Sequence, residues 1–173
     1  VQDTRVYLDH AASSPMPASV RDAVAEAMGR AGNPSSLHAS GRDARRGLEQ
    51  ARESVAADLG ARPGEVVFCS GGTEANNLAL LGAAGTHGDV LVSAVEHPSV
   101  AEARRLLGER VRVLAVDAAG RVDPAAVSSA IGPATRLVSV MWVNNETGVV
   151  QPVREIARVA GTAGVLAHSD AVQ

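Results

Sequence analysis

The chain has 173 residues, 46% of them apolar and 20% charged, which is typical of a folded globular domain and not of a disordered chain. Its formal net charge of -3 at pH 7 gives no electrostatic argument for nucleic-acid binding. No apolar run approaches the roughly 20 residues of a membrane span, and the N-terminus lacks a signal pattern, so no membrane association is expected. The histidines are scattered without metal-site spacing, so we predict no metal.

Two residue counts bear on function. A single cysteine, Cys69, excludes an internal disulfide framework and favours a reducing, cytoplasmic location. Because it ends an apolar run, we interpret it as an inert core thiol. The chain contains no lysine, and its 16 basic residues are all arginine. A reaction that needs a catalytic lysine must therefore take that lysine from outside these residues.

The first part of the chain is predicted to be an irregular segment followed by helices. Residues 1–15 are interpreted as a lead-in segment, and residues 16–173 as one domain, with no repeat or linker inside it. A helix is predicted over residues 18–30. A second, over residues 41–59, ends at Gly60, a typical helix C-cap.

From residue 65 onward, short apolar runs alternate with amphipathic stretches. The runs predict strands over residues 65–69, 89–94, 111–115, 136–142 and 164–168. The stretches between them predict helices over residues 73–84, 99–108, 124–131 and 153–163. Strands separated by single helices form parallel βαβ units with right-handed crossovers. We therefore predict an α/β fold, a mostly parallel sheet with helices on both faces.

Polar side chains follow four of the predicted strands. In an open α/β sheet, ligands bind beyond the carboxyl ends of the strands, so these segments are expected to meet at one edge. Together they supply hydroxyl, amide, imidazole and carboxylate groups to a candidate site. The four segments are Ser70–Glu74, Val95–Ser99, Val143–Gly148 and Ser169–Gln173.

The segment from Ser70 to Thr73 suits a phosphate group. Gly71 and Gly72 let backbone N–H groups approach a ligand, and the helix that follows offers unpaired N–H donors and a partial positive charge. The alternative is an ordinary glycine turn with Thr73 as the helix N-cap. No lysine follows the glycines, so the segment is not a P-loop.

Several single residues have both a functional and a structural interpretation. Asp170 closes an apolar strand, so its carboxylate needs a partner, either a protonated ring nitrogen or an arginine; it could also cap a helix. His97 could carry a proton, stack on a flat ligand or lie in a polar loop. Asn145 could hold a ligand oxygen or only shape a turn. His38 could line a site or cap a helix, and His168 is assigned no role.

Read in order, these segments resemble the cysteine desulfurases of the class V aminotransferase group, which are pyridoxal 5'-phosphate (PLP) enzymes of fold type I. The resemblance runs from Tyr7 to the last residue. Its motifs are Tyr7–Ala12, Gly32–His38, Ser70–Asn77, Glu96–His97, Val143–Gly148 and His168–Gln173. The resemblance implies that the chain is most of the large PLP-binding domain, in incomplete form.

The resemblance also implies residue roles. Gly72 and Thr73 would hold the cofactor phosphate, and Asp170 would pair with the pyridinium nitrogen. His97 would stack on the ring and assist proton transfer, which makes it the catalytic candidate. Asn145 and Gln173 would lie on the side of the ring that carries the hydroxyl group.

For the full-length protein the resemblance implies conversion of L-cysteine to L-alanine, with a persulfide passed on for iron–sulfur cluster assembly or tRNA thiolation. A homodimer and a sulfur-acceptor or scaffold protein are implied as well. The family's Schiff-base lysine, acceptor cysteine and small C-terminal domain come after the segment that Gln173 ends, and Cys69 is not that acceptor. The isolated chain is therefore expected to be inactive.

Two alternatives belong with this interpretation. The protein could be a selenocysteine lyase or another class V enzyme, which downstream residues would distinguish. It could also be a truncated, non-catalytic module for binding or dimerisation.

Overall fold

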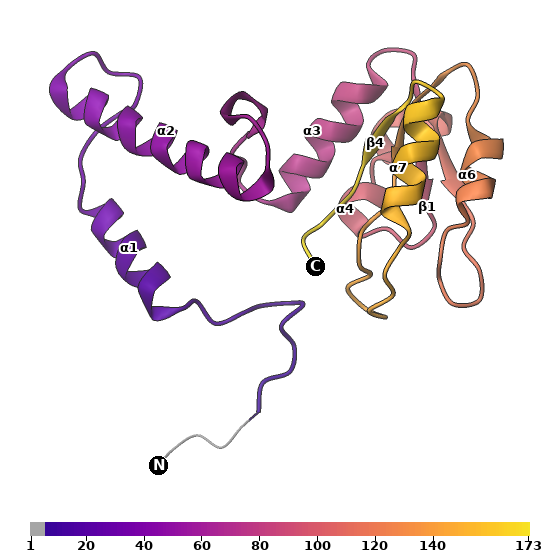
Figure 1. The fold of residues 1–173 in the computed structure, drawn as a ribbon, viewed down its shortest axis with the longest axis horizontal. Coiled ribbons are helices and arrows are strands. Elements are labelled where there is room, and N and C mark those ends of the chain that lie inside the picture. The colour runs from indigo at the N-terminus through magenta and orange to yellow at the C-terminus, as the bar shows by residue number, and fades with distance from the viewer. Residues whose placement is uncertain (1–5) are drawn as a thin grey trace. The chain divides into compact units, whose positions relative to one another are not determined.

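A computed structural model describes residues 6–173. The chain divides into two compact units, one ending at Phe68 and the other running from Cys69 to Gln173 (Figure 1). The boundary expected after residue 15 stays a prediction, and residues 1–5 of that lead-in segment lie outside the described residues. No helix within residues 6–173 is both long enough and apolar enough to cross a membrane.

The second unit is built on a four-stranded sheet in which every pairing is parallel, in the order β2-β1-β3-β4. This confirms the predicted parallel α/β fold. The central strands β1 and β3 are rich in Val and Leu because both of their faces are covered. The strands are β1 (Asp89–Ser93), β2 (Val111–Leu114), β3 (Thr135–Ser139) and β4 (Leu166–His168).

Helices cover both faces of this sheet (Figure 1). Successive strand residues point to opposite faces, so Val90 and Val92 of β1 enter one apolar cluster while Leu91 enters the other. The first face packs against α3 (Gly72–Ala84), α4 (Pro98–Ala101) and α5 (Arg104–Leu107). The second face packs against α6 (Pro124–Ala130) and α7 (Val153–Thr162).

The strand predicted over residues 65–69 is wrong. Pro63–Glu65 form a short 3₁₀ helix, η1, and the residues after it belong to no strand of the described sheet. Arg52 instead holds the segment against its own helix: its guanidinium donates to the Val66 carbonyl at 2.5 Å and lies 5.0 Å from the centre of the Phe68 ring. An apolar run does not reveal whether a neighbouring strand will pair with it, which is why the pattern misled.

The helix predicted over residues 99–108 is interrupted. Two short helices, α4 and α5, are joined by a tighter turn in which the Ala103 N–H donates to the Val100 carbonyl and the Arg105 N–H to the Glu102 carbonyl. These i to i-3 bonds replace the α-helical ladder over one turn. The helix η2 (Gly108–Arg110) then leads into β2.

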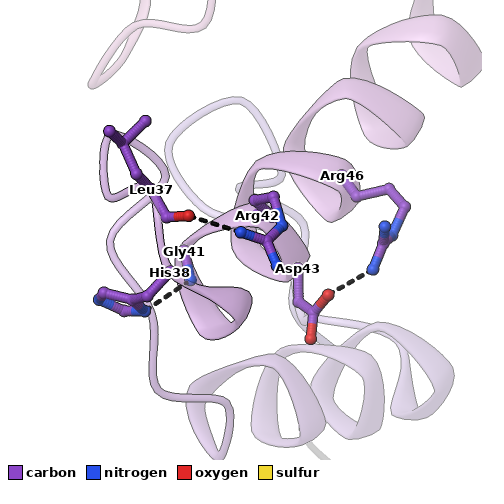
Figure 2. A network of polar contacts seen from close by, with 6 residues as sticks. All are labelled: Leu37, His38, Gly41, Arg42, Asp43 and Arg46. Carbon is purple, nitrogen blue, oxygen red and sulfur yellow. Dashed lines mark hydrogen bonds and ion pairs between the residues drawn. The ribbon is translucent and has the colours of Figure 1, made fainter.

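The first unit contains α1 (Ala18–Met28), α2 (Ala39–Leu59) and η1. The predicted C-cap is confirmed, since Gly60 has a φ of 65° and closes α2. Figure 2 shows the other end of α2, where His38 Nδ1 accepts from the Gly41 N–H at 3.4 Å. Of the two interpretations of His38, helix capping is thus the one that the structure supports.

The start of α2 is fixed by two further contacts (Figure 2). The Arg42 guanidinium donates to the Leu37 carbonyl at 2.6 Å, and Arg46 pairs with Asp43 one turn along. Gly41 is required at this point, because a Cβ there would lie 2.3 Å from the Ser36 carbonyl oxygen. The Gly32–His38 motif therefore has a structural use in forming this turn.

Candidate functional site

Asp170 lies just beyond the end of β4 and is buried, with 9% of its surface exposed. Asn76 Nδ2 donates to its Oδ2 at 2.8 Å, and the Val172 N–H donates to its Oδ1 at 3.1 Å. Both of these donors are neutral. Within residues 6–173 no arginine or histidine forms an ion pair with Asp170. A buried carboxylate with neutral partners is suited to receive a cationic group from a ligand.

Asn76 is a site residue that the sequence interpretation missed. It lies on α3 with Leu80 and Ala84, the buried positions of that helix, each four residues from the next. An amide on an otherwise apolar stripe is the signal that could have identified it. Its second N–H proton goes to Ser99 Oγ at 2.9 Å, so Asn76 joins the segments that follow β1 and β4.

His97 is the N-cap of α4, at the carboxyl edge of the sheet beyond β1. Its Nδ1 lies 2.8 Å from Ser99 Oγ and accepts from the Ser99 N–H at 3.2 Å. Ser99 is buried while the His97 residue is exposed. The contacts of Asn76 and Ser99 therefore connect His97 to Asp170. His97 and Asp170 follow β1 and β4, and the sequence predicted that such segments meet at the carboxyl edge of the sheet.

The N-terminus of α3 lies beside the segment that follows Asp170. A Cβ on Gly72 would be 3.1 Å from Val172 Cγ2, which shows how closely the two segments approach. Gly71 is the N-cap and no side chain caps the helix, so the interpretation of Thr73 as N-cap is wrong. The uncapped N–H groups of this turn are suited to an anion.

Glu74 organises the loop before this helix. Its Oε2 accepts from the Ser70 N–H at 2.6 Å and from Ser70 Oγ at 2.7 Å. These hydrogen bonds, the hydroxyl first, lower the pKa of Glu74 below its usual value. The carboxylate thus fixes the Ser70 end of the loop and leaves the turn at Gly71 open.

In the turn after β3, Asn144 makes the structural contacts. Its Nδ2 donates to the Val95 carbonyl at 3.0 Å, and its Oδ1 accepts from the Glu146 and Thr147 N–H groups at 3.0 and 2.9 Å. The neighbouring Asn145 is partly buried, and no hydrogen bond among the described residues joins it to Asp170. Its role, and that of the exposed Gln173, stay predictions.

Glu96 connects the ends of the two central strands. Its Oε1 accepts from Ser93 Oγ at 2.5 Å and from the Met141 N–H at 2.7 Å, while Oε2 is buried without a partner among the described residues. Burial raises the pKa of Glu96 to about 7, hydrogen bonds from Ser93 and Met141 oppose the rise, and the Asp170 carboxylate adds to it. The position of Glu96 in the Glu96–His97 motif did not predict this role.

His168 also has a structural contact. Its Nδ1 lies 2.9 Å from the Oγ of Ser139, which is fully buried in β3. Burial lowers the pKa of His168, and the Asp170 carboxylate opposes this. The contact between Ser139 and His168 connects β3 to β4 two residues before Asp170, so it helps to position that carboxylate.

Raising the pH from about 5 to about 8 is expected to destabilise the protein through Glu96, and Glu96→Gln is expected to remove this effect. The folded-state pKa of about 7 lies above the ordinary 4.5, so the folded protein binds this proton more tightly than the unfolded chain. The resulting stabilisation is fully present below pH 4.5 and is lost as the pH rises through about 7. Urea unfolding of the natural protein and the variant at several pH values measures it.

His168 also makes the stability depend on pH, and its contribution must be separated from that of Glu96. Because its pKa is lowered, its contribution is present above the unfolded-state value and is lost as the pH falls. The sign is opposite to that of Glu96, and the histidine is retained in both proteins. The difference between the two proteins therefore isolates Glu96, and parallel pH profiles would contradict the assignment.

Comparison with known proteins shows the family. The sequence model described as aminotransferase class-V matches residues 6–173, so the chain belongs to this family. Among the curated relatives is the IscS-like cysteine desulfurase of Mycobacterium tuberculosis, which is 43% identical in an alignment 180 residues long; the match covers 96% of this chain and 46% of that protein. The chain thus spans about half the length of the curated relatives that it matches.

Solved structures agree with this family and with the fold. A NifS-like protein superposes with a TM-score of 0.90 at 34% identity, covering 98% of this chain and 50% of that one. A structure described as SspA in complex with cysteine gives 0.87 at 35% identity, covering 96% and 50%. The chain therefore has the fold of about half of a PLP-dependent cysteine desulfurase chain.

Proposed function

We propose that the natural protein carrying this chain is a PLP-dependent cysteine desulfurase. The observation that supports this most is Asp170, a buried carboxylate at the carboxyl edge of the sheet that has only neutral partners within residues 6–173. A protonated pyridine nitrogen has the charge and the donor that such a carboxylate lacks. The names of the relatives point in the same direction.

The residues present fit PLP at two further points. The uncapped turn of Gly71, Gly72 and Thr73 suits a phosphate, and it approaches the segment that Asp170 begins. His97 offers a flat ring beyond β1, connected to Asp170 through Asn76 and Ser99. When bound, PLP would act as an electron sink for a carbanion, and Asp170 would hold the proton on its ring nitrogen. Asn145 and Gln173 are proposed to face the ring hydroxyl.

L-Cysteine is the proposed substrate and L-alanine the product, and the sulfur would leave as a persulfide on a cysteine other than Cys69. The structure of a similar protein in complex with cysteine supports this substrate class. We further propose a homodimer, a sulfur-acceptor or scaffold protein, a role in iron–sulfur cluster or tRNA sulfur supply, and a cytoplasmic location. The required lysine is proposed to lie in the half of the family fold that these residues do not span.

A substrate comparison tests the proposal. The natural protein, supplied with PLP and a thiol, is expected to release alanine from L-cysteine, and the isolated 173-residue chain to release none. Alanine from L-selenocysteine alone would favour a selenocysteine lyase. No alanine from either substrate would favour a non-catalytic module and would overturn the proposal.

A further inference from the structure

The hydrogen bonds between Asp170 and His97 have a fixed direction. Asn76 Nδ2 carries two protons, and it donates one to Asp170 Oδ2 at 2.8 Å and the other to Ser99 Oγ at 2.9 Å. The Ser99 hydroxyl is therefore an acceptor toward Asn76. Its own proton is left to donate to His97 Nδ1, 2.8 Å away.

A backbone group donates to the same ring nitrogen. The Ser99 N–H donates to His97 Nδ1 at 3.2 Å, and a backbone N–H can act only as a donor. A proton on Nδ1 would meet both this N–H and the proton of the closer Ser99 hydroxyl, so the two donors together hold Nδ1 unprotonated. In a neutral imidazole the ring proton then lies on Nε2.

Burial makes this arrangement costly to rearrange. Asn76, Ser99 and Asp170 expose 4%, 9% and 9% of their surfaces, so a donor that loses its partner there is not compensated by water. The nearby titratable groups Glu96 and His168 make their hydrogen bonds to other residues. Glu96 Oε1 accepts from Ser93 and Met141, and His168 Nδ1 contacts Ser139.

We propose that Asn76 and Ser99 are positioning residues that hold His97 as the neutral tautomer with its proton on Nε2. The ring then presents a hydrogen-bond donor, and not a base, at the nitrogen that faces away from Ser99. A ligand group that meets this nitrogen must be an acceptor, such as a carboxylate, phosphate or thiolate. The tautomer follows from the geometry of this chain, whereas its consequence for catalysis rests on the proposed function.

The tautomer can be read directly by NMR. Natural protein with ¹⁵N-labelled histidine, studied without PLP or substrate, is expected to show His97 with Nδ1 unprotonated and Nε2 protonated at neutral pH; His97→Gln assigns the signals. A proton on Nδ1, or on both nitrogens, would overturn the proposal. Because neither cofactor nor substrate is present, this outcome is independent of whether the protein is a desulfurase.

Variants of Ser99 then test the coupling. Ser99→Ala removes the hydroxyl that donates to Nδ1 and leaves Asn76 without one acceptor, so we expect a mixture of tautomers and a fall in kcat of about 10-fold with KM little changed. Ser99→Thr keeps the hydroxyl and is expected to restore the single tautomer. Ser129→Ala, on the exposed side of α6, is the matched control. An unchanged His97 spectrum in Ser99→Ala would contradict the role of the hydroxyl.

Discussion

Asp170→Asn is expected to weaken PLP binding to the natural protein by about 100-fold or more. Asparagine has nearly the same size, and its side-chain oxygen can still accept a hydrogen bond, but it removes the negative charge. Removing one partner of a buried charge pair costs on the order of 3–5 kcal/mol, because the other charge is left uncompensated. Absorbance titration of the PLP-free protein measures the affinity.

The matched control for this experiment is Asp58→Asn. Asp58 is an exposed carboxylate on α2, in the first unit, so its loss changes the net charge equally and leaves Asp170 intact. We expect PLP affinity close to that of the wild-type protein. Equal affinities of the Asp170 and Asp58 variants would contradict the pairing of Asp170 with the ring nitrogen.

Leu91→Ala is expected to lower the free energy of unfolding by about 2–5 kcal/mol. Leu91 is fully buried in β1, a central strand, where it packs with Val138, Ile156 and Ala160 on the second face of the sheet. The truncated side chain leaves a cavity that a sheet paired on both sides cannot close. Urea unfolding of the natural protein measures the difference.

Leu106→Ala is the control for this prediction, because Leu106 is 67% exposed on α5. A change of less than about 0.5 kcal/mol is expected there. If both leucine variants lost the same stability, the assignment of Leu91 to the core would be wrong. Because the same side chain is removed in both, the comparison tests burial and not the kind of residue.

The sequence predicts the layers of the second unit well because their signals are local. Apolar runs mark β1 and β3, which are buried on both faces, and Gly60 marks the end of α2. The convergence of Asp170 and His97 follows from a general property of parallel sheets, in which strand ends meet at one edge. Each of these predictions needs only a pattern within a few residues and a rule of topology.

Other features depend on contacts between distant segments and could not be predicted in this way. Asn76 donates to Asp170 across 94 residues of sequence, and Glu96 accepts from the Met141 N–H across 45. The apolar run at residues 65–69 resembled a strand, yet what decides its structure is whether another strand lies beside it. Spacing along the chain contains no information about such partners.

The cofactor content of the natural protein tests most directly whether these residues form part of a PLP site. Protein purified from its native source, then denatured to release its cofactor, is expected to yield about one PLP per chain, because Asp170 and the α3 turn together form one proposed PLP site. Less PLP is expected from Asp170→Asn prepared in the same way. A natural protein that holds no PLP, and binds none when it is supplied in excess, would contradict the account.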